Sequence, residues 1–181
     1  MPPAQVQIAL LRGINLAGAR RVGMAALRDL LTGHGYGDVR TYLQSGNVVL
    51  TSTAPPERLA RELEGQIGKG FGIDVQVLVR TRDELAAVVA RNPLGDVADD
   101  PAKYQVSFLA AEPDPEVVRA LAAEDVAPER FVVVGRELYA WHPGGVGRSP
   151  LAKLLTERRL GVGVTARNWK TVTALLELAD G

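Results

Sequence analysis

Residues 40–50, with the sequence RTYLQSGNVVL, predict a β-hairpin, because two runs suited to strands flank a Ser-Gly turn. Helical patterns lie on both sides of this hairpin. Residues 24–35 carry apolar side chains on one helical face, and residues 55–72 begin with prolines and end with glycines. Short apolar runs at residues 6–11 and 73–79 predict one further strand outside each helix. The resulting order, β-α-β-β-α-β, is the split βαβ pattern of ferredoxin-like proteins.

The same order of elements returns in the second half of the chain, after a helix expected at residues 82–92, which stops before Pro93, and a polar linker at residues 96–102. The repeat comprises strand 104–110, helix 114–124, hairpin 130–142, helix 149–161, strand 162–166 and a closing helix at 168–179. The sequence therefore predicts an α+β fold made by tandem duplication of a ferredoxin-like (βαββαβ) unit, with antiparallel sheets and helices on one face of each. The two units are expected at residues 1–95 and 103–181. A single irregular α+β sheet with the same elements is the alternative.

The composition excludes several classes of function. Lys and Arg together number 21, as do Asp and Glu, so there is no global positive field to attract a polyanion. Cysteine is absent and only two histidines occur, which excludes disulfides, thiolate metal sites, a cysteine nucleophile and multi-histidine metal centres. No metal or other cofactor is expected. The N-terminus lacks the charged region of a signal peptide, and no run approaches the roughly 20 apolar residues of a membrane span. These features predict a cytoplasmic protein with no membrane partner.

The loop after the first strand, RGINLAGARRVG, is long and is rich in glycine and arginine. Its residues Arg12, Asn15, Arg20 and Arg21 are candidates for an anion-binding lip. A loop whose arginines face water is the alternative. The spacing does not match the G-x-G-x-x-G fingerprint, so no dinucleotide site is predicted.

The hairpin turn is expected at the same end of the first sheet as this loop, because the first and second strands run in the same direction. Turn chemistry accounts for Ser45, Gly46 and Asn47, since such residues supply positive φ angles and brace the backbone. Gln44 is not explained by the turn. We therefore interpret the hairpin first as a turn and second as the wall of a binding site, to which Gln44, Ser45 and Asn47 contribute.

In the second half, GGVGRSPLAKLL at residues 144–155 leads into a helix with Ser149 as its N-cap. Gly147 allows close backbone approach, and Arg148 and Lys153 add positive charge near a helix N-terminus, which favours a phosphate or carboxylate ligand. Plain helix capping is the alternative.

The stretch RNWK at residues 167–170 offers a guanidinium and an indole to a base or a phosphate through Arg167 and Trp169. The alternative is that Asn168 caps the last helix while Trp169 packs beneath it. Strand directions place this stretch and the loop before residue 149 at one end of the second unit.

Arrangements suited to catalysis are scarce. His34 and His142 are expected to be caps or surface residues, and no Ser-His-Asp set can be assembled from the sequence. An enzyme therefore ranks below a binding protein.

With the motifs LLRGIN, DVRTYLQSGNVV, NPL, GVGRS and TARNW, the chain resembles the bacterial domain-of-unknown-function 1697 family, over about residues 10–178. The resemblance implies an α+β fold related to the ferredoxin-like plait, and it brings no established activity, cofactor or partner. The family motifs correspond here to Arg12, Gly13, Asn15, Gln44, Ser45, Gly46, Asn47, Gly147, Arg148, Ser149, Arg167, Asn168 and Trp169. The chain departs from the family in LAGARRVG, where a second glycine and a lysine-rich loop are usual.

The function predicted from the sequence is a binding module for a phosphate-bearing ligand, either a nucleotide or a nucleic acid. An enzyme acting on a small anionic substrate and a protein–protein adaptor with no small-molecule site are the alternatives. An uncovered edge strand of either sheet would also allow a homodimer.

Overall fold

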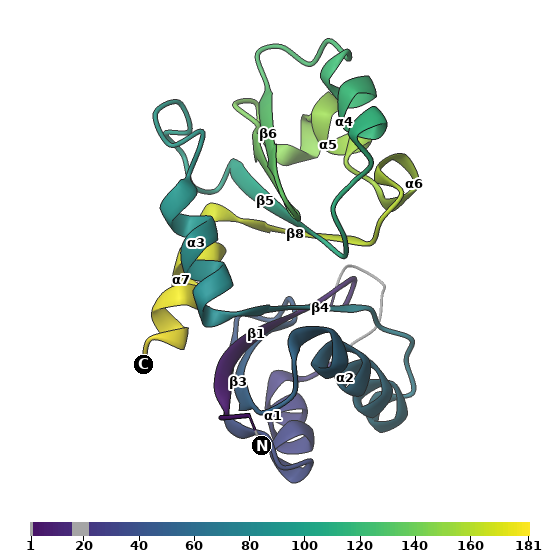
Figure 1. The fold of residues 1–181 in the computed structure, drawn as a ribbon, viewed down its shortest axis with the longest axis vertical. Coiled ribbons are helices and arrows are strands. Elements are labelled where there is room, and N and C mark those ends of the chain that lie inside the picture. The colour runs from purple at the N-terminus through teal and green to yellow at the C-terminus, as the bar shows by residue number, and fades with distance from the viewer. Residues whose placement is uncertain (1, 16–21) are drawn as a thin grey trace. The chain divides into compact units, whose positions relative to one another are not determined.

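The computed structural model describes residues 2–15 and 22–181, and the chain forms two compact units. The first comprises Met1–Ala87 with Ala174–Gly181, and the second comprises Val88–Thr173. In chain order the first unit contains β1 (Gln5–Leu11), α1 (Met24–Gly33), β2 (Gly37–Tyr42), β3 (Asn47–Ser52), α2 (Pro56–Phe71), β4 (Val77–Thr81) and the beginning of α3 (Arg82–Arg91), as Figure 1 shows.

The four strands of the first unit form one antiparallel sheet in the order β2-β3-β1-β4. The register pairs Gln5 with Ser52 at one end of the sheet and Leu10 with Asn47 at the other. This order confirms the ferredoxin-like arrangement that the sequence predicts.

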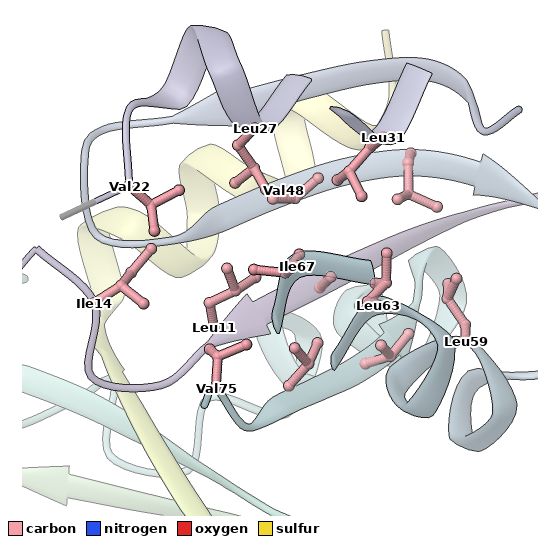
Figure 2. Close-up of a cluster of buried hydrophobic side chains, with 14 of the residues drawn as sticks. Leu11, Ile14, Val22, Leu27, Leu31, Val48, Leu59, Leu63, Ile67 and Val75 are labelled. Carbon is pink, nitrogen blue, oxygen red and sulfur yellow. The ribbon is translucent and has the colours of Figure 1, made fainter. Parts of the chain in front are cut away.

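A hydrophobic core lies between this sheet and the helices α1 and α2 (Figure 2). Leu27 and Leu31 of α1, and Leu59, Leu63 and Ile67 of α2, are fully buried, because a spacing of four residues repeats one helix face. Burial of each such side chain stabilises the fold by about 2 kcal/mol.

The ends of α2 follow from its sequence. Pro56 stands at the first turn, where a missing N–H costs no helical hydrogen bond. The helix ends at Gly72, which has a φ of +65° and closes the last turn through a hydrogen bond to the Gly68 carbonyl.

The second unit repeats the arrangement of the first. Its elements are β5 (Tyr104–Leu109), α4 (Pro115–Ala122), β6 (Arg130–Val134), β7 (Glu137–Trp141), the short 3-10 helix η1 (Val146–Arg148), α5 (Pro150–Leu154), α6 (Glu157–Leu160), β8 (Val164–Asn168) and the beginning of α7 (Trp169–Ala179). The sheet is antiparallel in the order β6-β7-β5-β8, equivalent to the first. An α+β fold of two ferredoxin-like units is therefore confirmed.

The prediction of one helix at residues 149–161 is wrong, because the structure has two helices there, α5 and α6. Thr156 interrupts it by acting as a new N-cap, with Oγ1 accepting from the Arg159 N–H at 3.3 Å. Both pieces still contribute to one core, in which Leu151 and Leu160 pack with Leu109, Leu138, Ala140 and Val164. None of the helices in the described residues has the length and hydropathy that crossing a bilayer requires.

The unit boundaries fall within two helices rather than in the segment 96–102, and they differ from the predicted ranges 1–95 and 103–181. Side-chain contacts account for the difference. The Tyr139 hydroxyl donates to the Val88 carbonyl at 2.8 Å, which attaches the end of α3 to the second sheet. Arg82 Nε pairs with Asp180 Oδ1 at 2.6 Å, which attaches the end of α7 to the first unit.

Candidate functional site

The loop after β1 and the turn between β2 and β3 meet at one end of the first sheet, as the strand directions predict. The Leu11 N–H donates to the Gly46 carbonyl at 2.8 Å. Gly46 has a φ of +81°, and a Cβ atom there would lie 2.7 Å from Leu11 Cβ and 2.9 Å from Ile14 Cδ1. Glycine is thus required both for the backbone angle and for the close packing of the two loops. We define residues 12–15 together with residues 43–47 as the Arg12 rim.

Asn15 ties the two loops of the Arg12 rim together through its side chain. Its Oδ1 accepts from the Val22 N–H at 2.8 Å, and its Nδ2 donates to the Val22 carbonyl at 2.8 Å. The same Nδ2 donates to the Gln44 carbonyl of the hairpin turn. One amide therefore holds residues 15, 22 and 44 at a common point. Arg20 and Arg21, which the sequence assigns to the same lip, lie outside the described residues.

Arg12 and Gln44 present their side chains at this rim. Arg12 Nη1 donates to Gln76 Oε1 at 2.8 Å, and the Arg12 N–H donates to the Gln76 carbonyl at 2.9 Å. Arg12 is half-buried as a residue, and its guanidinium bonds to the exposed side chain of Gln76. Gln44 is exposed, and its side-chain amide forms no hydrogen bond with any other residue that the structure describes.

Ser45 and Asn47 brace the turn. Asn47 is fully buried, and its Nδ2 donates to the Tyr42 carbonyl and to Ser45 Oγ, each at 3.0 Å. These hydrogen bonds stabilise the turn itself. The side-chain amide of Gln44 makes no such bond to the turn.

The rim also contains strained backbone. Leu43 has a φ of +57° and Asn15 a φ of +56°. Among the described residues, Leu43 is the one positive-φ position occupied by neither glycine, Asn nor Asp, and a left-handed conformation costs such a residue about 1–2 kcal/mol. Leu43 is also the one large apolar side chain in the described part of the chain that is strongly exposed, at 57%.

In the second unit, the N-terminus of α5 already binds a carboxylate of the protein itself. Ser149 Oγ accepts from the Ala152 N–H at 2.8 Å, as expected of an N-cap, and Glu129 Oε1 accepts from the Leu151 N–H at 3.0 Å. Ser149 is 1% exposed. The amide groups that the sequence offers to an external phosphate are therefore bonded to Glu129 and Ser149.

A buried polar cluster, the Glu129 cluster, consists of Glu129, His142 and Ser149. His142 Nδ1 lies 2.7 Å from Glu129 Oε2 and 2.7 Å from Ser149 Oγ, and Ser149 Oγ also donates to Glu129 Oε2. His142 is 0% exposed, so its expected place as a cap or surface residue is wrong. His34, in contrast, is the exposed C-cap of α1, as predicted.

This cluster does not have the geometry of a catalytic triad. A triad places the hydroxyl and the carboxylate on opposite imidazole nitrogens, whereas here both contact Nδ1. Nε2 is buried and bonds to no described residue. Burial raises the pKa of Glu129, but hydrogen bonds from Ser149, Leu151 and His142 outweigh it, so the pKa lies below its ordinary value. The cluster is a structural network that anchors α5 to the strand before it.

Gly147, Arg148 and Lys153 remain at the surface near this helix. All three are exposed. Neither Arg148 nor Lys153 forms a hydrogen bond or ion pair with any described residue. The two cations are solvated, which agrees with the capping alternative.

Arg167, Asn168 and Trp169 each make contacts within their own unit. Arg167 is 9% exposed, its Nη1 donates to Thr165 Oγ1 at 2.7 Å, and burial lowers its pKa to about 10. Asn168 Oδ1 accepts from the Thr171 N–H at 2.9 Å, which caps the start of α7. Trp169 stacks on Tyr104 with ring centroids 4.8 Å apart, so this face of the indole already has a partner.

Ser149 and Arg167 share an end of the second sheet but belong to opposite faces. Val106 of β5 pairs with Tyr139 of β7 and with Arg167 of β8, the two strands that flank it. The three side chains therefore lie on the same face of the sheet. Val164, three residues before Arg167, points to the other face, where it packs with Leu151 of α5. The second unit therefore does not bring these two candidates together around one ligand.

The sequence did not identify Glu129 as the partner of Ser149 and His142. Glu129 lies twenty positions before Ser149, and no motif links them. Of the described residues, no group of three His, Cys, Asp or Glu side chains is arranged to hold a metal ion.

Comparisons with known proteins agree with this fold. A family model described as "Protein of unknown function (DUF1697)" matches residues 5–139. The solved structure of the conserved bacterial protein SP0830 from Streptococcus pneumoniae is similar, with a TM-score of 0.77 and 22% sequence identity over 98% of this chain and 99% of that one. At that identity the likeness shows the fold alone. No curated protein matches the chain significantly.

Proposed function

We propose that this chain, which belongs to the family of proteins of unknown function DUF1697, binds a nucleotide or a short single-stranded nucleic acid at the Arg12 rim. The observation that carries the proposal is the strained backbone at the exposed residue Leu43, next to Gln44, whose carbonyl accepts a hydrogen bond from Asn15. Strain of this kind concentrates at sites that contact ligands.

We expect Arg12 to bind the phosphate of the ligand. Its guanidinium has a hydrogen bond to Gln76, which reduces the side-chain freedom that is lost when an anion binds. Gly13 follows with a φ of +70° and open space where a Cβ would be, so a ligand can approach the backbone closely. A charge-assisted contact of this kind contributes about 1.5–3 kcal/mol.

We expect Gln44 and Leu43 to contact the base of the nucleotide. A side-chain amide matches the paired donor and acceptor on the edge of a nucleobase. The Leu43 side chain, 57% exposed, provides an apolar surface for the face of the base. The two residues are adjacent, so one nucleotide can use both.

The charge of the protein favours a short ligand. Lys and Arg together number 21, and Asp and Glu together also number 21. The net charge is therefore zero, and a long polyanion would gain little binding free energy from it. The residues of the rim include no carboxylate or imidazole, and the proposal is therefore binding without catalysis.

Binding of a fluorescently labelled mononucleotide and of a short oligonucleotide, measured by anisotropy at two salt concentrations, tests the proposal. Arg12→Ala is expected to weaken binding by about 10–100-fold, and Gln44→Ala by about tenfold. Arg148→Ala is the matched control, because it also removes one arginine but in the second unit, and it is expected to bind normally. Equal losses in Arg12→Ala and Arg148→Ala would show a non-specific charge effect and would refute the site.

The exposed Leu43 also favours a second candidate function, a protein–protein adaptor. An exposed large apolar side chain gains free energy if a protein partner buries it in a pocket. Leu43→Asn keeps a residue that tolerates positive φ and removes the apolar surface. A protein partner that is lost in Leu43→Asn and retained in Arg12→Ala would support the adaptor over the nucleotide.

A further inference from the structure

The edge strands of the two sheets differ in how they are protected. An edge strand carries backbone N–H and C=O groups that no neighbouring strand bonds, and these groups can pair with a strand of another chain. The strand orders β2-β3-β1-β4 and β6-β7-β5-β8 place β2, β4, β6 and β8 at the edges. In the duplication β2 corresponds to β6, and β4 corresponds to β8, so each pair can be compared.

The edge of β4 is occupied by side chains of the first unit. The Gln76 carbonyl bonds to the end of β1, so the backbone groups of residues 77, 79 and 81 point outward. Glu64 Oε1 accepts from the N–H of residue 77 at 3.0 Å, and Glu84 Oε2 accepts from the N–H of residue 81 at 2.8 Å. Arg80 Nη1 donates to the carbonyl of residue 79 at 3.1 Å. Every outward residue of this edge therefore has a hydrogen-bond partner.

The edge of β8 repeats the arginine contact of β4. The Ala110 N–H donates to the Gly163 carbonyl, so the backbone groups of residues 164, 166 and 168 point away from β5. Arg167 Nη1 donates to the carbonyl of Ala166 at 2.9 Å, as Arg80 does to its own preceding residue. The central outward residue of β8 is therefore bonded as well.

The edge of β2 is irregular. Its register with β3 shifts between Gly37 and Arg40, and Asp38 within this stretch has a φ of +49°. Arg40 Nη2 also pairs with Asp38 Oδ2 at 3.4 Å. Bulges and charged side chains of this kind obstruct pairing with a further strand, so β2 is protected too.

β6, in contrast, is a regular and apolar edge. Residues 130–134, RFVVV, pair with β7 in continuous register. The Leu109 N–H donates to the Arg136 carbonyl, so even-numbered residues of β7 bond to β5 and odd-numbered residues bond to β6. The backbone groups of Phe131 and Val133 therefore point outward. Neither residue forms a hydrogen bond with any other part of the described chain.

We propose that β6 pairs with β6 of a second copy of this chain, which forms a homodimer about a two-fold axis at Val132. Phe131 and Val133 lie one residue on each side of this centre. A copy rotated by 180° therefore places Phe131 of each chain opposite Val133 of the other. Each of these residues offers one N–H and one C=O, so the two copies form four hydrogen bonds. Both side chains belong to the core-facing side of the sheet, where the aromatic ring of one copy contacts the valine of the other.

Charge also favours a second copy as the partner. Arg130 is the one charged residue of β6, and in this register it lies opposite Val134, so no like charges face each other. The chain carries 21 basic and 21 acidic residues, and its net charge of zero leaves no long-range repulsion between copies. The strand contributes five residues from each copy, so the interface is small and a dissociation constant in the micromolar range is expected.

Sedimentation velocity at protein concentrations from about 1 to about 500 µM tests the proposal, and a monomer–dimer equilibrium is expected. Val133→Pro removes one outward donor from each copy, and so two of the four hydrogen bonds, without loss of a bond to β7. This variant is expected to dimerise at least about tenfold more weakly. Val133→Ile keeps the N–H and the β-branched shape, and as the matched control it is expected to dimerise as the natural protein does.

Hydrogen exchange of the natural protein, followed by NMR, gives a measurement that does not depend on the folding of a variant. The Phe131 and Val133 amides are expected to exchange more slowly at high protein concentration than at low concentration. The Val132 amide, which bonds to β7, is expected to exchange slowly at both. The proposal is overturned if the natural protein stays monomeric over this range or if Val133→Pro dimerises as tightly. A dimer in which the Phe131 and Val133 amides exchange at an unchanged rate would also overturn it, since the contact would then lie elsewhere.

Discussion

Replacing Gly46 by alanine tests how the Arg12 rim is built. The change adds one methyl group at a residue with a φ of +81°, and that methyl carbon would lie 2.7 Å from Leu11 Cβ and 2.9 Å from Ile14 Cδ1. Leu11 Cβ cannot rotate away, because it is bonded directly to the backbone at the end of β1, and Leu11 itself is 1% exposed. The backbone of one of the two loops must therefore move.

The expected cost has two parts. A left-handed backbone costs alanine about 1–2 kcal/mol, and forcing a methyl group into a packed interior costs about 1–3 kcal/mol more. Gly72→Ala provides the matched control. Gly72 has a φ of +65° in the same unit, and nothing lies within 4 Å of the position of its Cβ, so this variant incurs the first part alone.

Urea unfolding followed by circular dichroism measures the free energy of unfolding of both variants. The loss in Gly46→Ala is expected to exceed the loss in Gly72→Ala by about 1–3 kcal/mol. Because both changes are in the first unit, any unequal stability of the two units affects them alike. Equal losses would refute the reasoning, since they would mean that the loops do not pack tightly at Gly46.

Two further predictions concern the second unit. Glu129→Gln is expected to lower the free energy of unfolding by about 2 kcal/mol at neutral pH. Because the folded pKa of Glu129 lies below its ordinary 4.5, the stabilisation is present above that value and is lost as the pH falls through the folded pKa, so the variant and the natural protein should converge in acid, and parallel pH profiles would contradict this. Tyr139→Phe removes the donor that lies 2.8 Å from the Val88 carbonyl and is expected to cost about 1–3 kcal/mol. Tyr104→Phe, whose hydroxyl accepts from the Leu94 N–H at 3.4 Å, should cost less, and equal losses of stability by tryptophan fluorescence would argue against that ranking.

The order of the elements could be predicted because its signals are local. The proline at position 56 and the glycine at position 72 mark the ends of α2, and its buried leucines repeat at helical spacing. The meeting of the two rim loops followed from strand direction, which the element order determines. These features depend on neighbours in the chain, so one sequence suffices to predict them.

The Glu129 cluster could not be predicted, because its members meet only through tertiary packing. Glu129 stands beside Arg130 in the sequence, as a solvated surface pair would, and its carboxylate reaches an amide at Leu151. The same contact removes the helix N-terminus from the candidate anion sites. The division of the helix at Thr156 was missed for a related reason, because a threonine inside an apolar pattern does not reveal that its hydroxyl caps a new turn.

The duplication supplies an internal control for the significance of the rim. The second unit joins β6 to β7 through residues 135–136, with its positive φ on Gly135, and joins β5 to α4 through residues 110–114. The first unit uses residues 43–46 and 12–23 for the same two connections. Since the same strand order forms with the shorter connections and without a left-handed leucine, the fold does not require the conformation of Leu43. Backbone strain of about 1–2 kcal/mol that the fold does not require is expected where a loop serves a ligand or a partner. The difference between the two units therefore supports the proposal that the binding site lies in the first unit.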